Sequence, residues 1–212
     1  CLGKLADGLE NYAGHFAKLL IGETGFDEAR AAVEVADAVA ALRGAAVGET
    51  GVVAIVVDAT HPLAGFAAAA APALLAGAAV VVKPSPKAPS AAYALCELSA
   101  RAEWPAGVLN LMQGDTQAIA GLCAAGIDRM VFVGNAALGA QIGAIAEAAG
   151  KVSLGDARKE IVAQSADFNA YRQRLASVAA AEPARDQAAK QSVSGKIAPK
   201  VEDKTPAATG KD

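Results

Sequence analysis

Apolar residues recur every three or four positions at the start of the chain, which predicts one amphipathic helix over 2–19. Gly22 and Gly25 are expected to end this helix. A second helix is predicted over 27–43. Residues 1–45 are therefore expected to form an N-terminal helical pair. The inward-facing stripes consist of Leu2, Leu5, Leu9, Tyr12, Phe16 and Leu19 in the first helix, and of Ala32, Val33, Val35, Ala36 and Val39 in the second.

Beyond residue 50, continuous apolar runs alternate with helical segments, a pattern typical of βαβ units. The run 51–57 is read as a strand covered on both faces, because it shows no polar alternation. The predicted fold class is therefore α/β, a doubly wound, Rossmann-like parallel sheet with flanking helices. Ligands of such sheets bind beyond the carboxyl ends of the strands. Parallel strands are predicted over 51–57, 79–83, 108–112 and 129–133, and helices over 62–75, 90–102, 117–125 and 136–149.

The pattern weakens after residue 149. Short strands are predicted over 151–154 and 160–163, and a polar helix, running from Phe168 to about Ala181, fills the segment 164–182. Residues 183–212 contain three prolines, scattered charges and no aromatic residue, a composition typical of a disordered tail. We expect any protein partner to bind this polar helix and tail.

Composition excludes several classes of protein. The chain is 54% apolar, which does not fit a disordered or fibrous protein. Only 4% of its residues are aromatic, so its core must be built from small aliphatic side chains. A net charge of −3 gives no electrostatic footprint for nucleic acid, and no such partner is expected. The longest apolar stretch, 64–82, is interrupted by Gly65, Pro72 and Gly77, so no membrane span is expected.

The three cysteines, Cys1, Cys96 and Cys123, are an odd number without metal-ligand spacing. Cys96 and Cys123 lie in apolar helical patterns and are read as buried, reduced thiols, which favours a cytoplasmic location. Cys1 has two explanations. A lipid-modified cysteine that follows a removed signal peptide is one, and a truncated or processed fragment is the favoured other.

Five short motifs follow one another along the chain in a fixed order, and together they resemble the nucleotide-binding half of an aldehyde dehydrogenase. The resemblance implies that residues 1–163 are a nucleotide-binding domain, truncated before the family's catalytic domain. The motifs are Glu23-Thr24-Gly25, the stretch from His61 to Ala92 that contains Lys83-Pro84-Ser85, the stretch from Pro105 to Gly114, the turn from Phe132 to Gly139, and Lys151–Leu154.

The resemblance also implies that NAD or NADP is the cofactor. Lys83 ends a strand at the carboxyl edge of the sheet, where its ammonium can reach a ribose hydroxyl with little desolvation, and Ser85 follows it. Gly134 and Gly139 bracket the start of a helix, whose free N–H groups suit a pyrophosphate. Pro86 stands where NAD-preferring members usually carry Glu, so we expect weak binding with little preference between the two nucleotides. The candidate cofactor residues are Lys83, Ser85, Gly114, Gly134, Asn135 and Gly139.

Aldehyde oxidation in that family also needs a thiolate nucleophile, a carboxylate base and an oxyanion donor. No cysteine follows Cys123, and Gly155 stands where the base Glu would be. Thr60 occupies the position of the oxyanion donor. Because the nucleophile and the base are missing, no catalytic residue other than Thr60 is assigned. His15 is read as a helix-surface residue and His61 as filling an aromatic position of the family.

Three functions remain open. The chain is a non-catalytic homologue or accessory subunit that binds NAD(P), or it is half of a split NAD(P)-dependent aldehyde oxidoreductase. The third alternative is a structural scaffold that uses the fold without a ligand. The resemblance by itself makes the chain an oxidoreductase family member that is expected to be inactive alone.

Overall fold

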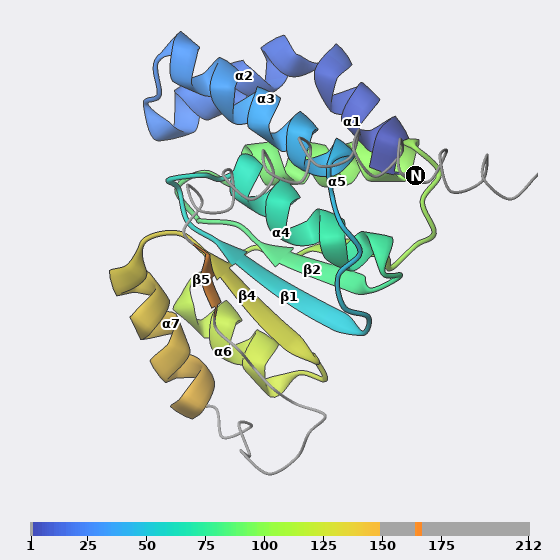
Figure 1. Cartoon of the computed structure of the whole chain (residues 1–212). Helices are drawn as coiled ribbons and strands as arrows, with labels where there is room; N and C mark the ends of the chain where they lie inside the picture. Colours follow the sequence, from blue (N-terminus) through green and yellow to red (C-terminus); the bar gives the residue numbers. More distant parts are fainter. Residues whose placement is uncertain (1, 149–163, 167–212) are drawn as a thin grey trace, which may run out of the picture. The chain divides into compact units, whose positions relative to one another are not determined.

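One parallel sheet organises the computed structural model, which describes residues 2–148 and 164–166 (Figure 1). Contacts divide the chain into residues 1–175 and 176–212, and every described residue belongs to the first unit. The strand order is β3-β2-β1-β4-β5, and every pairing is parallel. The prediction of four parallel strands in one sheet is confirmed. The strands are β1 (Val52–Val57), β2 (Ala79–Lys83), β3 (Leu109–Leu111), β4 (Arg129–Val133) and β5 (Gln164–Ala166).

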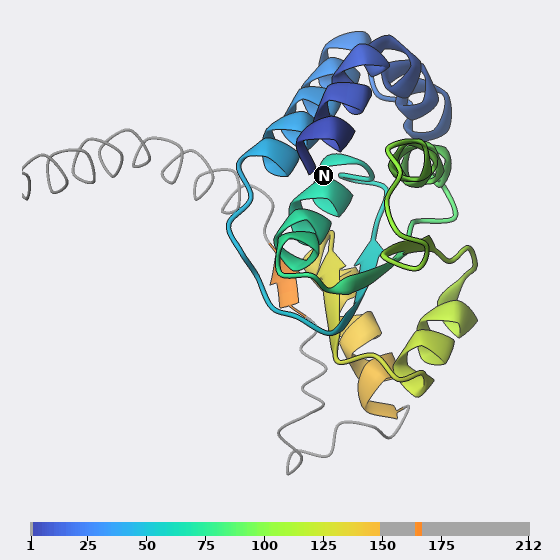
Figure 2. The same ribbon diagram turned by 90° about the vertical axis from the view of Figure 1, so that its right-hand side faces the viewer.

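Strand β1 is central because its side chains enter two separate cores. Val53, Ile55 and Val57 pack with helices α1 to α5 on one face of the sheet. Ala54 and Val56 pack with α6 and α7 on the other face. Figures 1 and 2 show these two helical layers on opposite sides of the strands. The helices are α1 (Leu2–Asn11), α2 (Ala13–Thr24), α3 (Glu28–Arg43), α4 (Ala64–Leu75), α5 (Ser90–Arg101), α6 (Thr116–Ala124) and α7 (Ala136–Ala148).

Small side chains let α4 lie close to the sheet. A Cβ placed on Gly65 would lie 2.7 Å from the Val133 side chain, so only glycine fits there. Most of the alanines of α4 are buried. This close packing explains how a chain with few aromatic residues fills its core.

The predicted first helix is in fact two helices. The chain leaves helical geometry at Tyr12, which is 50% exposed rather than part of the buried stripe. Helix α2 then runs through Gly22 and ends at Gly25, whose φ of 73° is the left-handed conformation common at helix ends. The break allows both halves to bury their apolar residues, with Leu20 rather than Leu19 in the core. The N-terminal part therefore holds three helices instead of a pair.

The inward face of α3 is also rotated from the prediction. Val33 is 48% exposed, and Ala32 and Ala36 face solvent as well. Glu34 is buried instead, because its carboxylate serves the start of α4. The buried positions of α3 are Ala31, Glu34, Val35, Ala38, Val39, Ala41 and Leu42.

Strand β5 pairs with β4 over three residues that the sequence assigned to the polar helix 164–182. The other expectations for this region, the strands 151–154 and 160–163, the helix 168–181 and the tail 183–212, lie outside the described residues. Among the described helices, none has the length and apolar character that a membrane crossing would require.

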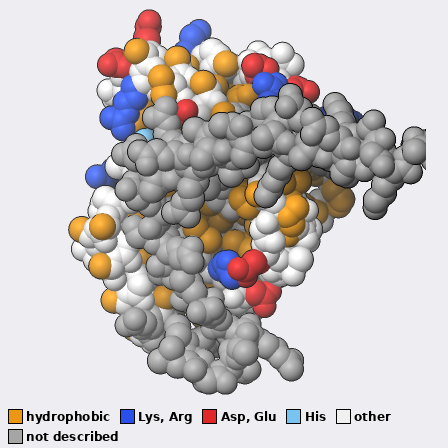
Figure 3. Space-filling view, viewed as in Figure 1, with side chains coloured by type: hydrophobic (Ala, Val, Ile, Leu, Met, Phe, Trp, Pro, Cys, Tyr) orange, Lys and Arg blue, Asp and Glu red, His pale blue; other side chains and the backbone are white. Residues whose placement is uncertain are grey.

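The surface carries charges of both signs. In Figure 3, acidic and basic side chains are interspersed over the helices α1 to α3 at the top of the view. The helix α7 at the left shows mainly apolar and uncharged side chains. The described residues visible in this view therefore show no patch of a single charge that would attract a polyanion.

Candidate functional site

The loops that follow the parallel strands meet at one edge of the sheet, as the fold class predicts. Asp58 follows β1, Lys83 ends β2, and Gly134 and Asn135 follow β4. Because β1 lies between β2 and β4, the loop after β1 is flanked by the other two. The Asp58 N–H continues the ladder by donating to the carbonyl of Val133 at 3.0 Å.

Lys83 is buried, with only 3% of its surface exposed. Its Nζ donates to the carbonyl oxygen of Pro84 at 2.7 Å and to that of Gly114 at 2.8 Å. Burial lowers the pKa of Lys83, and the nearby carboxylate of Asp115 opposes that shift. The expectation of a lysine with little desolvation is therefore wrong. The ammonium joins the loops after β2 and β3 and, among the described residues, uses two of its three N–H donors to do so.

Gly114 is required by the shape of its loop. Its φ is 139°, and a Cβ there would lie 2.7 Å from the Cβ of Ala118. The next residue, Asp115, accepts from the N–H of Gln117 at 2.8 Å and begins α6. Ser85 lies in the loop on the other side of Lys83, where its Oγ accepts from the N–H of Lys87 at 3.2 Å.

Asp58 is a buried carboxylate that the sequence analysis did not single out. Its Oδ2 accepts from the backbone N–H of Asn135 at 2.9 Å and from Asn135 Nδ2 at 3.3 Å. Its Oδ1 accepts from the N–H of Thr60 at 2.8 Å and, in a short hydrogen bond, from the Thr60 hydroxyl. The only sequence signal for this residue was an acidic side chain directly after a buried strand.

The residues expected around a pyrophosphate do lie together at the start of α7. The Asn135 side chain accepts from the N–H of Leu138 at 2.9 Å, and the Gly139 N–H donates to the Asn135 carbonyl at 3.0 Å. Gly134 is small because a Cβ there would overlap the Asp58 carboxylate and lie 2.6 Å from the Phe132 ring. In this structure the glycine therefore makes room for a carboxylate of the same chain.

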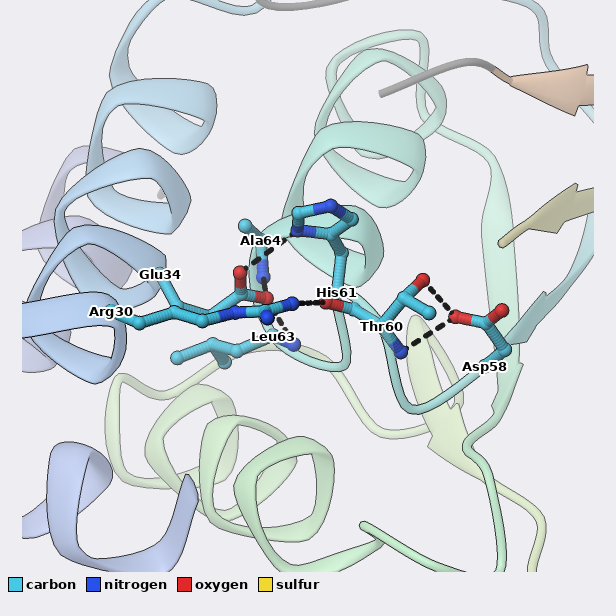
Figure 4. Close-up of polar contacts among 7 residues, drawn as sticks. All are labelled: Arg30, Glu34, Asp58, Thr60, His61, Leu63 and Ala64. Atoms are coloured by element: carbon cyan, nitrogen blue, oxygen red, sulfur yellow. Dashed lines mark hydrogen bonds and ion pairs between the residues drawn. The ribbon is translucent and has the colours of Figure 1, made fainter. Parts of the chain in front are cut away.

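Thr60 is not oriented as an oxyanion donor, because its hydroxyl donates to Asp58. Its carbonyl accepts from Arg30 Nη2 of helix α3 at 3.2 Å (Figure 4). The Arg30 guanidinium lies 3.9 Å from the centre of the Phe26 ring, which holds it in place.

Glu34 of α3 fixes the next part of the same loop (Figure 4). Its Oε1 accepts from the N–H of Leu63 at 3.2 Å and from that of Ala64 at 2.9 Å, so it caps α4. Its Oε2 lies 3.1 Å from Nδ1 of His61. His61 is thus paired with a carboxylate, a role that sequence reasoning missed because Glu34 is 27 residues away.

The motif Glu23-Thr24-Gly25 has a structural role. Glu23 accepts from the N–H of Ser90 at 3.1 Å and, in a short hydrogen bond, from the Ser90 hydroxyl. Thr24 donates to the Leu20 carbonyl at 2.6 Å. The motif therefore joins the end of α2 to the start of α5.

Of the two described cysteines, Cys123 is buried as the sequence predicted, whereas Cys96 is only partly buried. Burial raises the pKa of Cys96 to about 12, and burial also raises the pKa of the Cys123 thiol. Both side chains therefore stay protonated and unreactive. Among residues 2–148 and 164–166, no cluster of His, Cys, Asp and Glu could hold a metal ion.

Two surface grooves lie among the helices of the first layer, away from the strand ends. One, of about 590 Å³, runs between α2 and α5, and the other, of about 640 Å³, between α2 and α3. Asp58, Lys83 and Asn135 line neither groove.

Comparison with known proteins adds a family to this geometry. The model of the aldehyde dehydrogenase family matches residues 48–181. N-succinylglutamate 5-semialdehyde dehydrogenase of Caulobacter sp. (strain K31) is 48% identical over 69 residues, which cover 32% of this chain and 14% of that protein. Geranial dehydrogenase of Castellaniella defragrans is 36% identical over 132 residues, 59% of this chain and 27% of that protein. The chain therefore spans well under half of these relatives.

Solved structures share the fold. Proline utilization A superposes with a TM-score of 0.66 at 27% identity, covering 77% of this chain and 19% of that one. PnpE in complex with nicotinamide adenine dinucleotide has a TM-score of 0.66 at 26% identity, covering 77% of this chain and 37% of its own.

Proposed function

The chain belongs to the aldehyde dehydrogenase family, and we propose that it is an NAD(P)-binding domain that does not oxidise aldehydes by itself. The observation that carries the nucleotide-binding part is Lys83. Its ammonium is buried at the carboxyl edge of a parallel sheet, and two of its protons are held by carbonyl oxygens. The side chain is therefore already ordered, and a ligand that accepts from its remaining N–H costs it little further conformational freedom. The bound dinucleotide in the similar PnpE structure supports the same assignment.

The fit of a dinucleotide differs between the two sides of the loop after β1. On the β2 side, Lys83 and Ser85 offer donors, and the Gly114 loop is held against Lys83. On the β4 side, the N–H of Asn135 already serves Asp58. Lys83 and Ser85 would hold the ribose, and Gly134, Asn135 and Gly139 would lie near the phosphates. When bound, such a cofactor supplies a hydride acceptor.

The non-catalytic part of the proposal rests on the side chains that this chain offers to an aldehyde. Cys123 is buried and Cys96 is partly buried, and the raised pKa of each thiol disfavours the thiolate that would attack a carbonyl carbon. The Thr60 hydroxyl donates its proton to Asp58, so that proton is not available to stabilise an oxyanion. The position of Gly155 lies outside the described residues.

Calorimetric titration tests the proposal. NAD and NADP are titrated against the wild type, Lys83→Met and Lys18→Met, where Lys18 is an exposed lysine of α2 that matches the chemical change. Binding that is lost in Lys83→Met but kept in Lys18→Met supports the proposal, provided that thermal unfolding shows both variants folded. Absence of binding of either nucleotide to the wild type at millimolar concentration would favour the scaffold function instead.

A split oxidoreductase is the second candidate. Cys96 is partly buried, Cys123 is buried, and the raised pKa of each disfavours a thiolate, so in this case a separate polypeptide would supply the nucleophile. A partner that docks on residues 164–212 stays a prediction. Aldehyde-dependent NAD(P)H formation that requires both this chain and a co-purifying protein would support this candidate over the first.

A further inference from the structure

Asp58 is coordinated as a bound anion would be. Its two carboxylate oxygens receive four hydrogen bonds, from the backbone and side chain of both Thr60 and Asn135. The residue is buried, with only 6% of its surface exposed. A carboxylate in this position is stabilised by donors of the kind that bind phosphate oxygens.

The surroundings are shaped for this carboxylate. Asn135 precedes α7 and caps it, so its N–H belongs to the positive end of that helix. Gly134 lacks the Cβ that would collide with the Asp58 carboxylate. The chain therefore supplies both the donors and the space that an external anion would need, and fills them itself.

We propose that Asp58 is a built-in competitor for the pyrophosphate of a dinucleotide and thereby sets the affinity of the site for phosphorylated ligands. This inference rests on the proposed nucleotide-binding function. A phosphate must either displace Asp58 from the N–H of Asn135 or lie beside a like charge, and each route weakens binding. A ligand without phosphate, such as adenosine, meets neither obstacle.

Two variants test this role. Asp58→Asn removes the charge with little change in shape, and Asp58→Ala removes the whole carboxylate from beside Asn135. Asp128→Asn is the matched control, because Asp128 accepts from the N–H of Val52 at 2.8 Å at the opposite end of the sheet. The ligands are NAD, inorganic pyrophosphate and adenosine. Affinity is measured by calorimetry, and the NMR signal of the Asn135 backbone amide reports binding next to Asp58.

We expect NAD and pyrophosphate to bind about tenfold more tightly to Asp58→Asn, and at least as tightly to Asp58→Ala, while adenosine is unaffected. Asp128→Asn should match the wild type. Equal affinity of NAD for the wild type and both Asp58 variants would overturn the role of Asp58 and leave the nucleotide function standing. Pyrophosphate that gains affinity where NAD binds to no variant would support the role of Asp58 and overturn the nucleotide function. Failure of both ligands on every folded variant would overturn both.

Discussion

The Glu34 carboxylate lies 3.1 Å from the His61 imidazole and joins helix α3 to the loop after the central strand. The same carboxylate accepts from two N–H groups at the start of α4. Helix α3 thus holds the loop that carries Asp58 and Thr60, and so belongs to the support of the site.

Glu34→Ala should lower the free energy of unfolding by about 2–3 kcal/mol, because it strands buried N–H groups of Leu63 and Ala64. Urea denaturation measures the change. Glu97→Ala, at an exposed position of α5, is the control and should cost little. Equal small effects in both variants would mean that Glu34 does not hold the loop.

Gly134→Ala should destabilise the protein by about 1–3 kcal/mol, since its methyl group would meet Asp58 and Phe132. Most of the collision with Asp58 disappears in the Asp58→Ala background. A double-mutant cycle by thermal unfolding should therefore give a smaller cost for Gly134→Ala there. Strictly additive costs would contradict the contact.

The raised pKa of Cys96, about 12 against an ordinary 9.0, makes stability depend on alkaline pH. The unfolded thiol loses its proton first, so the stabilising contribution is complete below pH 9 and is lost as the pH rises to 12. Between pH 8 and pH 10 the wild type should lose about 1 kcal/mol more than Cys96→Ala does. Denaturation at the two pH values measures this difference, and parallel losses would show that the thiol is solvated.

The purified chain should produce no NAD(P)H from aldehydes, because its described thiols are protonated. A spectrophotometric assay with NAD and NADP checks this. Turnover that survives replacement of Cys96 and Cys123 by Ala would indicate a contaminating enzyme. Turnover that Cys123→Ala abolishes would overturn the non-catalytic assignment.

Pro86 is exposed and cannot accept a hydrogen bond through its side chain. Pro86→Glu should restore a charged acceptor worth about 1.5–3 kcal/mol, which raises NAD affinity by about ten- to hundredfold. NADP should gain less, because a 2′-phosphate would be repelled. Calorimetry on both nucleotides measures the ratio. Pro86→Gln separates hydrogen bonding from charge, and tight, NAD-selective binding by the wild type would refute the expectation.

Most of the sheet could be predicted because β1, β2 and β4 are largely continuous apolar runs that need cover on both faces, whereas the polar strand β5 could not. The run 51–57 became β1, and the order of βαβ units fixed the parallel direction. The break at Tyr12 escaped prediction because the spacing of apolar residues continues across it. The rotated face of α3 escaped as well, since Glu34 is buried only by virtue of partners near residue 63.

The candidate site was predicted in part. The family motifs led to Lys83 and Gly114, which the structure joins, and to Asn135, which the structure joins to Asp58; that these residues bind a nucleotide stays a prediction. They did not indicate that Lys83 is buried or that Asp58 faces Asn135. Those facts depend on loops that meet only across the sheet, and no local pattern records them.

The hydrogen bond from Asn135 to Asp58 joins positions 77 residues apart in the chain. It can form only after β4 has docked beside β1, which itself requires the intervening strands and helices to leave that edge open. Closing so long a segment is a slow, non-local step of folding. The hydrogen bonds between Asp58 and Asn135 should therefore form late in folding, once β1 and β4 have paired in their native register.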